Sequence, residues 1–97
     1  MRVWLDDIRK MPEGYDVWVK TVDTAIELID KGIVTHISLD NDLGEDKEVG
    51  YFVACYIENL AYHKAIPKLT WAVHTMNPVA RKVMTQALEN ADKFWSK

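Results

Sequence analysis

The feature that most constrains the fold is a set of short apolar runs, each of which stops abruptly at a polar side chain. β-Branched and aromatic residues dominate these runs, as is typical of β-strands. Three of them end in or are followed by Asp6-Asp7, Asp40 and His74, and they occupy residues 2–5, 34–40 and 69–73. A fourth run covers residues 16–20. The chain therefore predicts four strands.

Segments with helical periodicity separate most of these strands. We expect helices over residues 21–31 and 49–64, and a last helix that opens at Asn77-Pro78, a preferred cap and first-turn pair. The buried face of the second helix is predicted to consist of Val49, Phe52, Val53, Tyr56 and Leu60. The link after the first strand contains a turn signal and has room for at most a brief helical turn. A polar loop is expected over residues 41–48.

Alternating strands and helices predict an α/β fold with a parallel sheet. Right-handed crossovers favour a flavodoxin-like strand order 2-1-3-4, and we expect helices on both faces. Residues 1–97 are expected to form a single domain. The fourth strand would leave one sheet edge unpaired, with Trp71 on it, which suggests a homodimer.

Charge and composition exclude several classes of function. The net charge of −3 provides no basic field, so direct binding to nucleic acid is not expected. A single cysteine, Cys55, allows no internal disulfide, and no apolar run has the length of a membrane span or of a signal peptide's apolar region. We therefore expect a cytoplasmic protein without membrane contact.

The carboxyl ends of parallel strands meet at one sheet edge, which brings Asp6, Asp7, Asp40 and His74 together. Carboxylates at such distances repel each other, by roughly 1 kcal/mol per pair in water. A divalent cation, Mg²⁺ or Mn²⁺, would relieve this repulsion, and so would a shared proton. His74 could act as a general acid or base, as a donor to phosphate, or as a ligand for a softer metal.

The last helix adds donors for an anion. Its amino end follows His74, so its free amides and positive dipole would face the same site, and Arg81 could reach the same anion. We expect Asn77 to cap the helix first and to touch a ligand second. Asp42 is either a turn residue or a site residue.

Three motifs resemble the cyclic-phosphate processing receiver domain family: residues 4–9, residues 38–44 and residues 74–78. The resemblance implies a shortened response-regulator receiver that processes or binds cyclic-phosphate nucleotides in conflicts such as those between phage and host. It places Asp6, Asp7, Asp40, Asp42, His74 and Asn77 in the active pocket, with Arg9 and Arg81 as helpers.

The chain departs from a full receiver at two places. The fourth strand ends in His74 where a receiver has serine or threonine, although Thr75 follows directly, and we expect no fifth strand with its lysine among residues 1–97. Histidine is also common in the family at the position of Asn41. Phosphoacceptor signalling through Asp40 is therefore disfavoured by the sequence.

Three functions remain open at this point. The first is a metal-assisted phosphoesterase for a small cyclic phosphate or nucleotide. In it Asp6, Asp7 and Asp40 hold the cation, Asp40, Asp42 and His74 act in catalysis, and Arg9, Thr75, Asn77 and Arg81 bind phosphate. The second is a non-catalytic binder that sequesters the nucleotide. The third is a degenerate receiver that serves as an interaction module.

Overall fold

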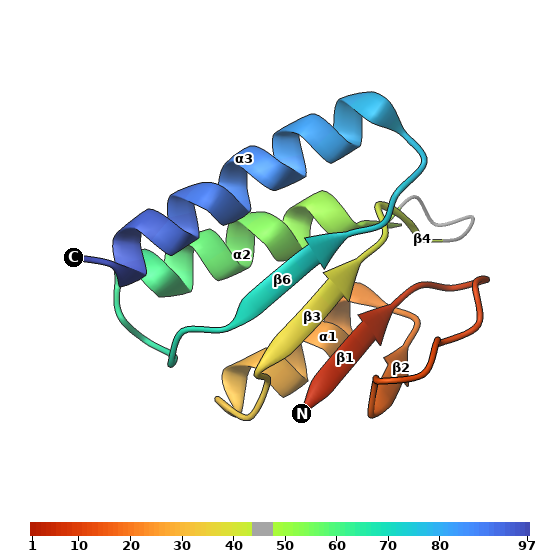
Figure 1. Cartoon of the computed structure of the whole chain (residues 1–97), viewed down its shortest axis with the longest axis horizontal. Coiled ribbons are helices and arrows are strands. Elements are labelled where there is room, and N and C mark those ends of the chain that lie inside the picture. The colour runs from red at the N-terminus through yellow and green to blue at the C-terminus, as the bar shows by residue number, and fades with distance from the viewer. Residues whose placement is uncertain (44–47) are drawn as a thin grey trace.

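Four parallel strands form the sheet on which the molecule is built (Figure 1). The computed structural model describes residues 1–43 and 48–97. Its elements in chain order are β1 (Arg2–Leu5), β2 (Val17–Val19), α1 (Val22–Asp30), β3 (His36–Leu39), β4 (Asp42–Leu43), β5 (Glu48–Val49), α2 (Gly50–Tyr62), β6 (Thr70–Val73) and α3 (Pro78–Trp95).

The strands follow the order β2-β1-β3-β6, and every neighbouring pair is parallel. The predicted receiver-like α/β fold and its strand order are therefore confirmed, with β6 as the fourth strand. In the register, Trp4 lies beside Trp18 on one side and beside Ser38 on the other, and Ser38 lies beside Ala72. The sheet has no fifth strand within the part of the chain that the structure describes.

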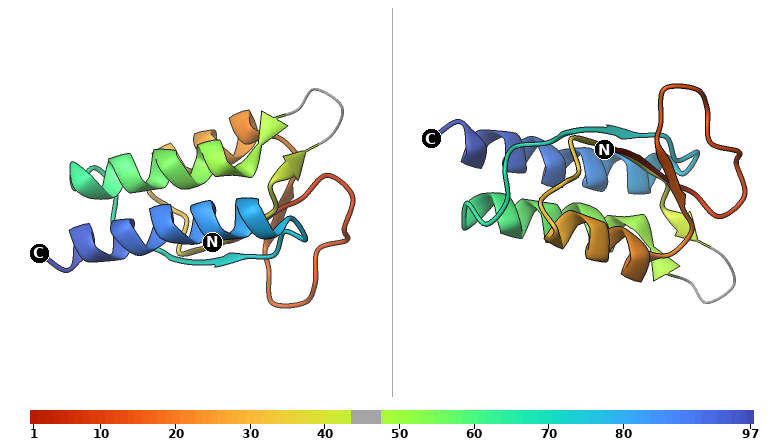
Figure 2. Two further views of the ribbon diagram at one scale, coloured as in Figure 1. Left: turned by 90° about the horizontal axis from the view of Figure 1, so that it is seen from above. Right: turned by 90° about the horizontal axis from the view of Figure 1, so that it is seen from below.

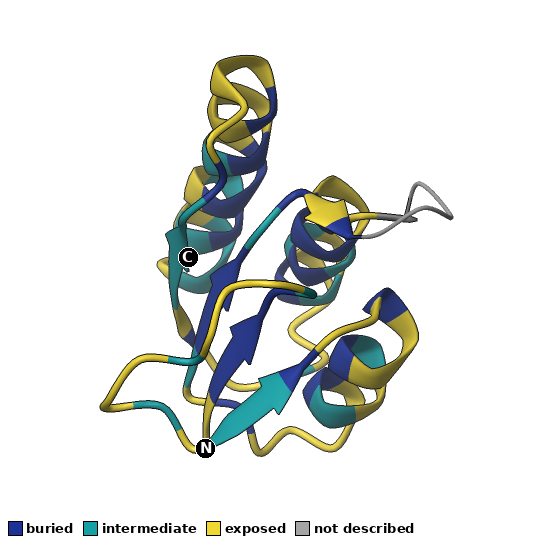
Figure 3. Cartoon of the chain, turned by 90° about the vertical axis from the view of Figure 1, so that its right-hand side faces the viewer, coloured by how far each residue is buried: buried dark blue, intermediate teal, exposed yellow. Residues whose placement is uncertain are grey.

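All three helices cover the same face of the sheet, so the expectation of helices on both faces is wrong (Figures 2 and 3). The connections from β2 to β3 and from β3 to β6 run in the same direction across the sheet, and right-handed crossovers then put α1 and α2 on one face. The connection from β1 to β2 runs the opposite way and belongs on the other face. Its turn residues, Pro12 and Gly14, form no helix there.

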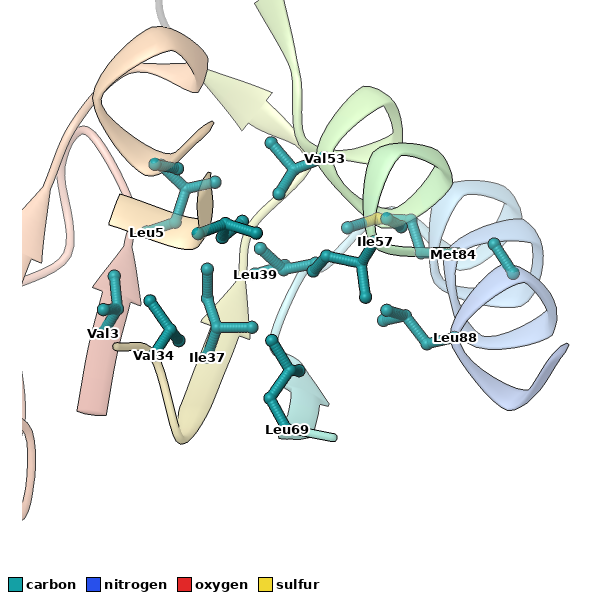
Figure 4. Packing of buried hydrophobic residues seen from close by; sticks show 14 of the residues in the cluster. Val3, Leu5, Val34, Ile37, Leu39, Val53, Ile57, Leu69, Met84 and Leu88 are labelled. Atoms are coloured by element: carbon teal, nitrogen blue, oxygen red, sulfur yellow. The ribbon is translucent and has the colours of Figure 1, made fainter. Parts of the chain in front are cut away.

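The core lies between the sheet and the helices (Figure 4). Alternate strand residues point into it, and the largest of them meet Ile57 of α2 and Leu88 of α3. Small side chains of α2 are part of this core, since Ala54 and Ala61 are fully buried. The predicted face of α2 is therefore wrong in part: Phe52 is 55% exposed and Val49 is 38% exposed.

The predicted polar loop contains a short antiparallel pair, β4 with β5, and Val49 belongs to β5 rather than to the helix. Residues 44–47, including the glycine of the 38–44 motif, lie outside the described residues. After the pair, the chain returns to the end of β3, where the amide of Gly50 donates to the carbonyl of Asn41 at 2.8 Å. A Cβ atom on Gly50 would lie 1.8 Å from the carbonyl oxygen of Asp40. This close approach fixes the amino end of α2 against the strand end.

No helix of the described residues is long and apolar enough to cross a membrane.

Candidate functional site

Strand alternation places three polar side chains on the sheet face that carries no helix. Asp6, Asp40 and His74 extend the ladder of the strands by one residue, because their amides donate to Val19, Leu5 and Leu39 at 3.1, 3.0 and 3.0 Å. Each of the three follows, two positions later, one of the register neighbours Trp4, Ser38 and Ala72. Since side chains alternate between faces, all six point to the same side.

Asp6, Asp40 and His74 form one compact cluster at the carboxyl edge of the sheet. One ligand atom of each lies within 4.8 Å of the others. Asp6 is 1% exposed, whereas Asp40 and His74 are partly buried. The three strand ends predicted to meet do so.

Asp6 is a buried carboxylate that is held by three donors. Its Oδ1 atom accepts from the amides of Ile8 and Arg9, both at 2.8 Å, and its Oδ2 atom lies 3.0 Å from Nε2 of His74. Burial acts to raise the pKa of Asp6, but these three hydrogen bonds together outweigh it and hold the pKa below its usual value. Asp6 is therefore ionised at neutral pH.

Asp40 has fewer donors than Asp6. Its Oδ1 atom accepts from the amide of Asn41 at 2.8 Å, and its Oδ2 atom accepts no hydrogen bond from the described residues. Burial raises the pKa of Asp40, and the negative charge of Asp6 adds to the effect, against opposing contributions from Asn41, His74 and Arg9. The cluster therefore pairs a stabilised carboxylate with one whose charge is disfavoured.

His74 is engaged at both ring nitrogens. Nδ1 lies 2.7 Å from Oγ of Ser38, and Nε2 faces Asp6. Its ring stacks on Trp4 with 3.8 Å between centroids and 6° between planes. Burial lowers the pKa of His74 more than the two carboxylates raise it, so the imidazole is neutral at pH 7 and its contact with Asp6 is a hydrogen bond rather than an ion pair.

Arg9 connects the link after β1 to the end of β6. Its Nη1 atom donates to the carbonyl of His74 at 2.8 Å, and its own carbonyl accepts from Nε1 of Trp4 at 3.0 Å. The predicted helper Arg9 thus lies at the cluster, where its charge also lowers the pKa of Asp40.

The amino end of α3 is capped by its own chain. Oδ1 of Asn77 accepts from the amides of Val79 and Ala80, both at 3.1 Å, while Pro78 has no amide hydrogen. The amide of Arg81 donates to the carbonyl of Asn77. The cap predicted for Asn77 is therefore confirmed, and it occupies the amides that were expected to be free for an anion.

Several predicted residues stand apart from the cluster. Thr75 is buried and its hydroxyl oxygen accepts from the amide of Asn77 at 3.2 Å. Asp7 and Arg81 form no side-chain hydrogen bond or ion pair with residues 1–43 or 48–97. Asp42 is exposed on β4, where it accepts from Nδ2 of Asn41 at 3.3 Å.

Asn41 has a structural task at the position where the family often has histidine. Its Oδ1 atom accepts from the amide of Tyr51 at 3.1 Å, which caps an α2 helix whose own N-cap residue, Val49, provides no side-chain bond. The side chain thus joins β3 to α2 and does not take part in the acid cluster.

Sequence reasoning missed Ser38 and Trp4 as parts of the site. Both precede a site carboxylate by two positions, which places them on the same sheet face. Period-two alternation was therefore the available signal, but the assignment also requires the register that joins β1 to β3.

The oxygens of the cluster suit a small, hard divalent cation. Oδ2 of Asp6 accepts a single hydrogen bond, and Oδ2 of Asp40 accepts none from the described residues, so each keeps a lone pair for an ion. Two carboxylates completed by water are an ordinary ligand set for Mg²⁺. The imidazole of His74 is committed to Ser38 and Asp6 and is not a ligand in this arrangement.

A known protein family matches most of the chain. The family model for the cyclic-phosphate processing receiver domain matches residues 1–90 of the 97 residues. Comparison with curated proteins and with solved structures gave no match. The match covers all of the sheet, the cluster and most of α3.

Proposed function

Because the chain belongs to the cyclic-phosphate processing receiver domain family, we propose that it is a metal-assisted phosphoesterase acting on a small cyclic phosphate or cyclic nucleotide. The observation that carries this proposal is the gathering of Asp6, Asp40 and His74 within 4.8 Å. Such a site at the carboxyl ends of parallel strands is where ligands of this fold class bind.

Asp6 and Asp40 are the proposed ligands of Mg²⁺ or Mn²⁺. Asp6 is held in its ionised form by three donors, whereas burial, followed by the negative charge of Asp6, raises the pKa of Asp40, and a bound cation would offset both effects. A bound ion would polarise a phosphate oxygen and lower the pKa of a bound water. Asp7, which follows Asp6 in sequence, stays a proposed additional ligand.

The phosphate is proposed to lie between the cluster and the amino end of α3. The first amides of α3 are capped by Asn77. The donors proposed to meet phosphate oxygens are therefore the guanidinium groups of Arg9 and Arg81 and the side-chain nitrogen Nδ2 of Asn77. The hydrolysis adds one water to the cyclic phosphodiester and breaks one P–O ester bond. The product is a linear phosphate monoester.

One observation favours the alternative of a binder that sequesters the same ligand without cleaving it. Both nitrogens of His74 are hydrogen-bonded within the protein, to Ser38 and Asp6, so neither nitrogen is left to face a leaving group of the ligand in this arrangement. A binder needs the cation site and the phosphate donors but no general acid.

A panel of cyclic mononucleotides and dinucleotides, incubated with the protein and Mg²⁺ or Mn²⁺, tests the proposal. After denaturation the released nucleotides are separated by chromatography. A linear phosphate product made by the wild type and lost in Asp40→Asn supports the phosphoesterase, and Glu89→Gln, an exposed acid on α3, serves as the matched control.

Ligand that is depleted from solution and then recovered intact supports the binder instead. A receiver would gain acid-labile phosphate from a small phosphodonor, and Asp40→Asn would prevent this. If no nucleotide is retained or cleaved and the metal leaves the melting temperature unchanged, the proposal is wrong, because any ligand of the native state must stabilise it.

A further inference from the structure

We propose that His74 is a positioning residue for the Asp6 carboxylate, and that Ser38 and Trp4 fix its ring so that it serves neither as a proton donor nor as a metal ligand. The inference about the ring rests on contacts alone. Its consequence for cation binding rests on the function proposed above.

The hydrogen-bond partners of the ring assign its hydrogen atom. Nε2 faces the carboxylate of Asp6, which can only accept, so Nε2 must carry the hydrogen. When the ring carries this one hydrogen, Nδ1 is an acceptor, and the hydroxyl of Ser38, 2.7 Å away, can donate to it. The chain of hydrogen bonds therefore runs from Ser38 through His74 to Asp6, with every polar atom of the ring satisfied.

Trp4 fixes the plane of the ring. The two ring planes are nearly parallel and their centroids are 3.8 Å apart. Trp4 is itself held, because its Nε1 atom donates to the carbonyl of Arg9 and the ring of Tyr15 meets it edge-on at 5.3 Å. Tilting the ring would break the stack, and turning it over within its plane would break both hydrogen bonds.

Ser38 acts through His74 and not on a ligand. It is 2% exposed, and it lies in the middle of the sheet between Trp4 and Ala72. The buried hydroxyl is bonded to Nδ1 of His74, which lies two positions beyond Ala72. The register of β1, β3 and β6 thus dictates the chain of contacts.

Asp6 is the residue that these hydrogen bonds orient. The amides of Ile8 and Arg9 hold its Oδ1 atom and His74 holds its Oδ2 atom, so the carboxylate cannot turn without losing a donor. Partners of this kind that orient a ligating carboxylate typically change metal affinity by about 10–100-fold when they are removed.

The first arm of the test uses the metal-free protein labelled with ¹⁵N at histidine. Long-range ¹H–¹⁵N correlation at neutral pH is expected to show His74 with hydrogen at Nε2 and a hydrogen-bonded Nδ1 acceptor. Ser38→Ala should shift the Nδ1 resonance toward that of an unbonded nitrogen and leave Nε2 protonated. A hydrogen at Nδ1 in the wild type, or no shift in a folded Ser38→Ala variant, would overturn the proposal.

The second arm compares the Mn²⁺ affinity of two variants, His74→Ala and His74→Gln, measured by electron paramagnetic resonance. Glutamine can still donate an amide hydrogen to Asp6 but cannot transfer a proton, whereas alanine can do neither. We expect His74→Ala to weaken binding at least about tenfold and His74→Gln to recover most of that loss. Equal loss in both variants, with unfolding curves that show both to be folded, contradicts the positioning role.

Hydrolysis separates the two proposals. A His74→Gln protein that binds Mn²⁺ and nucleotide but forms no product, under conditions where the wild type does, identifies His74 as the proton donor and overturns the inference. If the wild type binds no Mn²⁺, the proposed function fails, and the resonances of His74 still decide whether its ring is held as described.

Discussion

Two carboxylates that end neighbouring strands are held in opposite ways. Asp6 has three donors and a lowered pKa, whereas Asp40 has a raised pKa, first through burial and then through the charge of Asp6. The repulsion between two such carboxylates is relieved when a cation or a proton lies between them. The local difference, rather than the number of acids at the edge, makes this pair the centre of the site.

Replacing Asp40 with asparagine tests whether its charge is a cost to the fold. Without metal we expect Asp40→Asn to be as stable as the wild type or more stable, by up to about 1 kcal/mol, the scale of one like-charge pair in water. Mg²⁺ should raise the melting temperature of the wild type and leave that of the variant unchanged. Calorimetric melting with and without Mg²⁺ measures both effects, and a variant clearly less stable than the wild type would point to a structural role.

His36 predicts how stability depends on pH. On the sheet face that carries no helix, its ring is hydrogen-bonded to the hydroxyl of Thr70 at 2.7 Å and to the hydroxyl of Tyr15 at 3.2 Å. Burial, followed by the charge of Arg2, lowers the pKa of His36. The unfolded chain, with a histidine pKa of about 6.5, therefore binds the proton more readily, so stability falls as the pH drops through that value.

His36→Gln should flatten this pH dependence. Urea unfolding at several values between pH 7.5 and pH 5.5 compares the two proteins, and His74, whose pKa is also lowered, contributes a slope of the same sign to both. An identical slope in the two proteins would show that His36 carries no part of the effect.

At the residue scale, sequence was sufficient for the strand ends and insufficient for their partners. Asp6, Asp40 and His74 could be predicted because each follows a recognisable strand. The hydrogen bond between Ser38 and His74 depends on the register of β1, β3 and β6, which no local sequence pattern contains. The capping of α3 could be foreseen from Asn77-Pro78, but its consequence, that the first amides are taken, follows from the observed bonds.

At the scale of elements, the amino ends of α2 and α3 determine how closely the helices approach the site. Gly50 begins α2 against the backbone of Asp40, where an added Cβ would lie 1.8 Å from the carbonyl oxygen. Backbone on both sides leaves no flexible group to move aside. The helix and the strand end that carries Asp40 must therefore shift together if this position is enlarged.

Gly50→Ala is expected to destabilise the protein by about 3 kcal/mol or more, as overpacking against rigid backbone does. Gly14→Ala is the matched control, because Gly14 has a φ of +93° but no atom within 4 Å of an added Cβ. That change should cost about 1 kcal/mol through backbone strain alone. Equal losses in the two variants, measured by urea unfolding, would mean that the contact with Asp40 is easily relaxed.

Asn77 combines a confirmed cap with a proposed phosphate contact, and two substitutions separate them. Asn77→Ala should lower the free energy of unfolding by about 1 kcal/mol through loss of the cap. Asn77→Ser keeps a capping oxygen and should restore stability while lacking the amide nitrogen. Nucleotide binding measured by calorimetry is expected to be weaker in both variants, and full affinity in the serine variant would remove Asn77 from the ligand site.

The elements that sequence misjudged share a physical cause. Hydrophobicity favoured Phe52 for the buried face of α2, yet the fully buried positions of this helix include Ala54 and Ala61, whose small side chains allow close approach of neighbouring elements. The β4–β5 pair was missed since two-residue strands have no periodicity of their own. Strand existence and order followed from patterns that extend over whole segments.

At the scale of the molecule, one face of the sheet carries three helices and the other carries the link between β1 and β2 (Figure 3). The direction of each crossover explains this arrangement. The link between β1 and β2 contains the turn residues Pro12 and Gly14, which explains why it puts no helix on its face of the sheet. The cluster of Asp6, Asp40 and His74 lies at the carboxyl edge of the sheet, on the face that carries no helix.

The predicted homodimer is also a property of the whole molecule. β6 lies at one end of the sheet order and pairs with β3 on its other side. Sedimentation over a wide concentration range measures the mass in solution, and we expect association through this edge to appear as a dimer at high concentration. A monomer mass at every concentration would remove the prediction.

The most direct test of the account is a map of ligand binding by amide resonances of ¹⁵N-labelled protein. With Mg²⁺ and a cyclic nucleotide from the panel, we expect shifts at residues 6–9, 38–42 and 74–81, and their absence in Asp40→Asn. Shifts confined to the far ends of α2 and α3, or none with any nucleotide of the panel, would contradict a cation-dependent cyclic-phosphate site at the ends of β1, β3 and β6.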